Sequence, residues 1–180
     1  MNLLYIAAAC ALLGLGYAFV LTGKINKVSE GTERMKEIAS AIAEGARAFL
    51  FAEYKILAIF AVALFGLLTV LRGLPTAVCF IFGALLSIIA GYCVMNVATK
   101  ANVRTANAAK ESGLAAALSV AFSGGAVMGL CVAGLGLFGV AVVYAITGNA
   151  DILFGFSLGA SSIALFARVG GGIYTKAADV

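Results

Sequence analysis

The sequence predicts an all-α protein, a polytopic bundle of transmembrane helices. Hydrophobic residues make up 63% of the 180 residues and charged residues only 11%, which excludes an ordinary soluble domain. The charges are clustered and leave five apolar stretches, and one bilayer crossing needs about 20 apolar residues. We expect a single membrane domain over residues 1–180 without a soluble domain. The expected spans are about 3–22, 50–71, 76–99, 114–146 and 152–174.

The first two spans differ in how they begin. Leu3–Thr22 has no cationic segment before it and is longer than the apolar part of a signal peptide, so we interpret it as a span. Thr32 is a candidate N-cap for the next helix. No helix breaker except Gly45 separates Thr32 from Leu71, which favours one helix with a cytoplasmic extension. The alternative is a separate amphipathic helix lying along the membrane.

Turn signals mark where the third and fourth spans begin. Arg72–Pro75 predicts a tight turn before the third span, because proline suits the start of a helix. Ser112–Gly113 predicts the end of that helix and the start of the next. Two GxxxG pairs, Gly125 with Gly129 and Gly155 with Gly159, predict close helix contacts, since small residues let helices approach in a lipid environment.

The distribution of cations predicts the orientation. The connections after spans one and three, with their flanks, contain nine cations, whereas the connections after spans two and four contain Arg72 alone. The nine are Lys24, Lys27, Arg34, Lys36, Arg47, Lys55, Lys100, Arg104 and Lys110. The positive-inside rule places these connections in the cytoplasm and the N-terminus outside. The C-terminal segment with Lys176 and Asp179 is then cytoplasmic.

Composition also excludes several kinds of chemistry. The chain has no histidine, so histidine bases and histidine metal sites are excluded. Its cysteines fall inside apolar stretches without CxxC spacing and are interpreted as small buried residues. These are Cys10, Cys79, Cys93 and Cys131. No basic tract suggests a nucleic-acid partner.

The segment Arg168–Asp179 contains the candidate functional residues. A charge at bilayer depth costs about 2.5–3.5 kcal/mol, so Arg168 is a functional candidate. On an ideal helix Asp179 lies within roughly 20° of Arg168, and Lys176 about 80° away. Such a surface could hold an anion through Lys176 and a metal ion through Asp179. The alternative is a snorkelling arginine with an ordinary cytoplasmic lysine. No carboxylate partner for Arg168 is obvious within the five spans.

Several segments resemble the membrane-integral, ion-pumping pyrophosphatases. They are Glu30–Ala39, Glu44–Leu50, Glu53–Lys55, Ala101–Thr105, Ala121–Gly129 and, most specifically, Gly159–Asp179. The resemblance implies a homodimer of all-helical subunits with about sixteen spans of about 20 residues each. It also implies hydrolysis of inorganic pyrophosphate coupled to the pumping of protons or sodium ions.

The same resemblance assigns roles to three residues. Lys176 matches a lysine that contacts pyrophosphate, Asp179 an aspartate that binds substrate-associated Mg²⁺, and Arg168 an arginine in the ionic path to the gate. Mg²⁺ is therefore the expected cofactor, and K⁺ is a candidate activator. The expected location is the plasma (inner) membrane of a bacterium, in contact with lipids.

The family's motif continues beyond Val180, so we expect an N-terminal fragment of a larger pump that lacks most of the active site and is inactive alone. Two other classes of function are compatible with the residues. One is a non-enzymatic transporter or channel subunit that uses Arg168 and Asp179 for ion passage. The other is a helical membrane-assembly protein whose glycines serve only packing.

Overall fold

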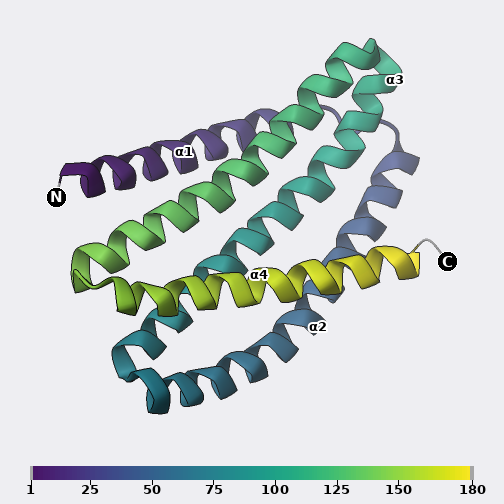
Figure 1. The fold of residues 1–180 in the computed structure, drawn as a ribbon. Coiled ribbons are helices and arrows are strands. Elements are labelled where there is room, and N and C mark those ends of the chain that lie inside the picture. Colours follow the sequence, from purple (N-terminus) through teal and green to yellow (C-terminus); the bar gives the residue numbers. More distant parts are fainter. Residues whose placement is uncertain (1, 179–180) are drawn as a thin grey trace.

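A computed structural model describes residues 2–178, and these residues are almost entirely helical (Figure 1). The helices are α1 (Asn2–Asn26), α2 (Glu33–Arg72), α3 (Leu74–Thr147) and α4 (Ala150–Ala178). All four are long and apolar enough to cross a membrane. Many large apolar side chains on their outward faces are exposed, as expected for helices surrounded by lipid or by further helices. The prediction of an all-α membrane protein is confirmed.

Helix α2 is one continuous helix of 40 residues. Thr32 caps it as predicted, because its hydroxyl oxygen accepts a hydrogen bond from the backbone N–H of Met35 at 3.4 Å. Gly45 does not interrupt the helix. The expected extension of the second span is therefore confirmed, and the alternative of a separate helix along the membrane is wrong.

Helix α3 is broken at Gly113 and folds back on itself. Gly113 has a φ of 79° and a ψ of −173°. This conformation lies outside the helical region, and its positive φ favours glycine. Residues 74–112 and 114–147 therefore form two adjacent arms (Figure 1). The break predicted at Ser112–Gly113 is confirmed.

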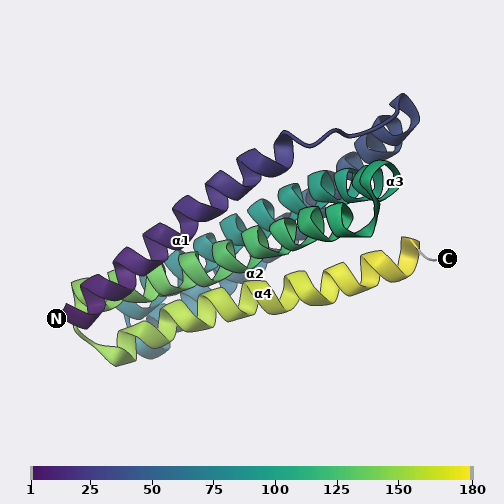
Figure 2. The ribbon, with the colours of Figure 1, turned by 90° about the horizontal axis from the view of Figure 1, so that it is seen from above.

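The two arms of α3 form the centre of the bundle. Helix α3 contacts α1, α2 and α4, whereas α1 contacts neither α2 nor α4 among the described residues. Figure 2 shows α1 and α4 on opposite sides of α3. Both views place the bend of α3, the α1–α2 connection and the end of α4 at one end of the bundle. The start of α1 and the other two connections lie at the opposite end.

Close contact between α3 and α4 depends on glycine. A Cβ atom on Gly155 would clash with the carbonyl oxygen of Thr76, and one on Gly159 would clash with that of Phe80. The predicted packing role of this pair is confirmed. Gly125 and Gly129 instead have no atom within 4 Å of a Cβ position, so their predicted packing role is wrong within this chain. Sequence spacing identified both pairs, but helix rotation decides which pair faces a neighbour.

Candidate functional site

Helix α4 contains two of the three predicted site residues. Arg168 and Lys176 are both exposed in this chain, and neither forms an ion pair with a described residue. They lie eight positions apart, about 12 Å along a helix, so the structure does not bring them together. Asp179 lies outside the described residues. The structure thus positions the cations of the predicted site but not its carboxylate.

Metal binding requires more ligands than the described residues assemble. Within residues 2–178 no group of three acidic, cysteine or histidine side chains is close enough to share a metal ion. Mg²⁺ prefers octahedral coordination by oxygen atoms and commonly uses one or two carboxylates together with substrate phosphates. Residues 2–178 therefore assemble no metal site made of three such side chains, and a magnesium site shared with substrate phosphates would need only one or two carboxylates.

A carboxyl group on α2 contacts α4 close to Arg168. Glu53 on α2 lies against Gly170, where a Cβ atom would be only 2.6 Å from its Oε1 atom. Both carboxyl oxygens of Glu53 are buried, each with less than 1 Å² accessible, and neither has a hydrogen-bond partner among the described residues. Glu53 and Arg168 form no ion pair, so Arg168 has no carboxylate partner among the described residues, as the sequence predicted.

The neighbours of Glu53 fix its position along the bundle. The hydroxyl group of Tyr54 donates a hydrogen bond to the carbonyl oxygen of Ile88 on α3, at 3.2 Å. Leu57 on α2, Ala84 on α3 and Ile163 on α4 form a buried cluster nearby along the same helices. Three helices thus converge next to Glu53, and this convergence holds its carboxyl group at the α2–α4 contact.

A second polar cluster joins the α1–α2 connection to α3. The Arg104 side chain, only 8% exposed, forms an ion pair with Glu30, with 2.8 Å between Nη2 and Oε1. Its Nε atom also donates to the carbonyl oxygen of Val28 at 3.1 Å, and its Nη1 atom to that of Lys100 at 2.8 Å. The guanidinium group therefore has acceptors on both sides, which compensates its burial.

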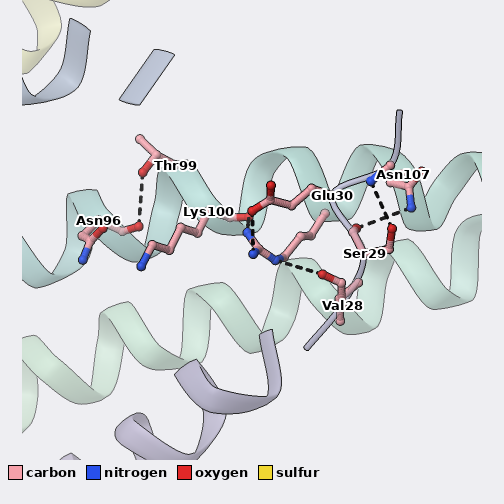
Figure 3. Close-up of polar contacts among 9 residues, drawn as sticks. Val28, Ser29, Glu30, Asn96, Thr99, Lys100 and Asn107 are labelled. Atoms are coloured by element: carbon pink, nitrogen blue, oxygen red, sulfur yellow. Dashed lines mark hydrogen bonds and ion pairs between the residues drawn. The ribbon is translucent and has the colours of Figure 1, made fainter. Parts of the chain in front are cut away.

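Asn107 extends this cluster by one helical turn. Its Nδ2 atom donates to the carbonyl oxygen of Ser29 at 3.4 Å, and Figure 3 shows Val28, Ser29 and Glu30 of the connection beside α3. Gly31 follows with a φ of 84°, and a Cβ atom there would be 2.5 Å from the Oδ1 atom of Asn107. Residues 28–31 are thus held against α3. Sequence reasoning did not pair Glu30 with Arg104, since no spacing rule relates a residue of the α1–α2 connection to one that follows 74 positions later on α3.

The fold and these buried charges define a helical integral membrane protein, and comparison with known proteins gives its family. The family model described as "Inorganic H+ pyrophosphatase" matches residues 12–180. The chain therefore belongs to this family. The resemblance seen in the charged segments is confirmed.

Individual relatives are similar over nearly the whole chain. A Clostridium tetani protein named "Putative K(+)-stimulated pyrophosphate-energized sodium pump" is 56% identical, covering 93% of this chain and 25% of the relative. A K(+)-insensitive pyrophosphate-energized proton pump of Methanosarcina mazei is 46% identical, covering 99% and 27%. A K(+)-stimulated pyrophosphate-energized sodium pump of Thermotoga maritima is 40% identical, covering 98% and 28%. The chain spans about a quarter of the length of these curated relatives.

We predict that Arg104→Ala lowers the free energy of unfolding by about 1–3 kcal/mol, because the buried acceptors around the guanidinium group lose their donor. Denaturant-induced unfolding of this chain in detergent micelles measures the change. Arg34→Ala is the control, since the ion pair of Arg34 with Glu37 is 75% and 69% exposed and should contribute little. Equal destabilisation by both substitutions would contradict the assigned role of the Arg104 cluster.

Proposed function

We propose that this chain is the N-terminal part of an ion-translocating inorganic pyrophosphatase, which hydrolyses pyrophosphate and pumps protons or sodium ions. The observation that carries the proposal is the family match over residues 12–180. It is supported by relatives named as pyrophosphate-energized pumps, at 40–56% identity. Because the chain spans about a quarter of these relatives, the activity belongs to the full-length parent protein.

The chemistry of pyrophosphate fits the residues at the end of α4. Pyrophosphate carries several negative charges, so its site needs cations that neutralise it and orient the attacking water. Lys176, exposed at the end of α4, would contact a phosphate group. Asp179 would hold substrate-associated Mg²⁺, which neutralises the phosphate oxygens when bound. The remaining ligands would come from the rest of the parent protein.

We assign Arg168 to the ionic path rather than to the substrate. It lies about 12 Å along α4 from Lys176, so the two side chains would not both contact the same pyrophosphate. A charge at that depth is costly without a partner, which suits a residue that interacts with ions or carboxylates in the path. The transported ion is H⁺ or Na⁺, because the relatives include pumps named for each.

The proposed topology has five crossings, two of them formed by the arms of α3. The reversal at Gly113 supports this number, because it returns the chain to the end of the bundle where α3 began. The cation-rich connections gather at the end of the bundle where α4 ends. The positive-inside rule makes that end cytoplasmic and leaves the N-terminus outside. We place the pump in a bacterial plasma membrane, as a homodimer of subunits with about sixteen spans of about 20 residues each.

Activation by K⁺ is a variable property of the relatives. Two are named as K(+)-stimulated and one as K(+)-insensitive. We therefore propose K⁺ as a candidate activator of the parent protein. Pyrophosphatase activity measured with and without K⁺ tests this directly, and equal rates would assign the parent to the insensitive type.

We predict that the full-length parent hydrolyses pyrophosphate only with Mg²⁺ and that Asp179→Asn abolishes turnover. The substitution removes the charge that would hold the metal ion while preserving the shape of the side chain. Phosphate release from purified protein measures turnover, and membrane abundance shows whether insertion is unchanged. Parent-like turnover of the variant would remove Asp179 from the site.

We predict that Arg168→Ala in the full-length parent reduces ion transport per turnover more than it reduces apparent pyrophosphate affinity. An ionic-path residue acts on the transported ion, whereas a substrate ligand acts on binding. Hydrolysis and ion uptake, measured on the same reconstituted vesicles, give both quantities. A pure loss of affinity with an intact pumping ratio would instead make Arg168 a substrate ligand.

Cysteine labelling in intact cells tests the orientation, once the native cysteines are replaced. We predict that cysteines at positions 27 and 112 resist an impermeant reagent and that a cysteine at position 149 reacts. All three positions are exposed in the structure, so burial within this chain does not protect them. The reverse pattern would place Lys176 on the wrong side of the membrane for a cytoplasmic substrate.

A further inference from the structure

The carboxyl group of Glu53 has no role in the site described above, and its surroundings are unusual. Both of its oxygen atoms are buried and lack a hydrogen-bond partner among the described residues. No cationic side chain of residues 2–178 lies within 4.0 Å of them. Most buried polar groups in proteins have a partner, and an unpartnered ionised carboxylate is strongly destabilised. The arrangement therefore requires an explanation.

Further helices of the parent protein do not readily supply a charge partner for the carboxyl group of Glu53. Each carboxyl oxygen of Glu53 already exposes less than 1 Å² in this chain alone. Additional helices can only cover these atoms further, so a cation from elsewhere cannot reach them while α2 and α4 stay in contact. In this closed arrangement the smallest species that can neutralise the carboxylate is a proton bound to one of its oxygens.

Glu53 also lies at a particular level of α4. It contacts Gly170, which is two positions after Arg168 and six before Lys176. At 1.5 Å per residue, Glu53 therefore lies about 3 Å from the level of Arg168 and about 9 Å from that of Lys176. It is 19 residues before Arg72, about 28 Å along α2, which is close to one hydrocarbon thickness of about 30 Å. The carboxyl group thus lies near the membrane boundary, between the two cations of α4.

The contact that covers Glu53 is suited to opening. Among the helix pairs in contact, α2 and α4 share the least extensive contact. Gly170 begins the run Gly170–Gly172, and each glycine lowers helix stability relative to alanine because its backbone loses more conformational freedom in a helix. A Cβ atom at Gly171 would meet no atom within 4 Å, so close packing within this chain does not require glycine at this position. A small movement of this segment would expose the carboxyl group to water.

From these observations we propose that Glu53 is a proton-exchanging group of the pump. It holds a proton while Gly170 covers it, and it releases that proton to water when the glycine segment of α4 moves away. Its protonation therefore favours one position of the segment that carries Lys176, which makes Glu53 a positioning residue that couples the substrate site to the membrane. This inference rests on the proposed pyrophosphatase function.

Among the described side chains, the other titratable groups near this contact are few. The hydroxyl group of Tyr54, next to Glu53 on α2, donates a hydrogen bond to the carbonyl oxygen of Ile88. Cys93 on α3 is near enough to influence Tyr54 electrostatically. On α4 the charged residues nearest to Gly170 are Arg168 and Lys176, both exposed, whereas Asp151 lies in the first turn of the helix. Release of the proton would create a carboxylate between these two cations, which would favour the open arrangement.

The test compares three variants of the full-length parent in reconstituted vesicles. Glu53→Gln keeps the size of the side chain but exchanges no proton, and we expect turnover and ion uptake to fall by about tenfold or more. The apparent KM for pyrophosphate should stay within about twofold, a change of less than 1 kcal/mol. Glu53→Asp keeps the carboxyl group and should retain more activity than Glu53→Gln. Glu44→Gln is the matched control, because Glu44 lies on the same helix and is exposed.

Parent-like turnover and ion uptake by Glu53→Gln would overturn the inference, since an amide cannot replace an exchanging carboxyl group. Equal losses in Glu53→Asp and Glu53→Gln would also overturn it. Absence of pyrophosphate hydrolysis by the parent itself would instead refute the proposed function.

Infrared spectroscopy provides a readout that does not depend on hydrolysis. Spectra of the parent recorded across a pH titration should contain a carboxylic-acid C=O band that is absent from Glu53→Gln. Identical carboxylic-acid bands in the two proteins would overturn the assignment of a proton to Glu53, whether or not the parent hydrolyses pyrophosphate.

Discussion

Direct backbone contact between α3 and α4 is the constraint on which the candidate site depends. Gly83, Gly155 and Gly159 each lie against a main-chain carbonyl group of the facing helix, so that any side chain there would force the helices apart. In a membrane, helix association relies on such packing because lipid supplies no hydrophobic drive. This contact fixes the distance and rotation of α4. It thereby sets where Arg168 and Lys176 lie relative to the other helices.

Two ionisable side chains lie in low-dielectric surroundings near the proposed cytoplasmic end, and they differ in their polar partners. Arg104 is surrounded by acceptors from Glu30, Val28 and Lys100, so its charge is compensated in place. Glu53 has no such partner among the described residues. A buried charge with compensating partners holds two structural elements together. A buried carboxyl group without a partner has two states, charged and protonated, whose free energies differ. The first arrangement suits a fixed connection, and the second suits a segment that moves.

Much of the fold follows from local features of the sequence. Long apolar stretches required helices, Thr32 and Gly113 marked helix ends, and the absence of breakers between Thr32 and Leu71 gave one long helix. The contacts between helices were harder to predict. Gly125 and Gly129 have the same spacing as Gly155 and Gly159 but face no neighbour in this chain. The partnership of Glu30 with Arg104 had no local signal at all.

The sequence by itself determined the helices, their approximate ends and the segment of α4 that contains Arg168 and Lys176. These properties depend on hydrophobic length and on backbone hydrogen bonds between residues four apart, which local sequence controls. Only the tertiary structure decided that Glu53 lies against Gly170 and that Arg104 holds residues 28–31. Such contacts depend on the rotation and translation of whole helices. Those are set by the summed packing of many side chains, so no single sequence motif contains them.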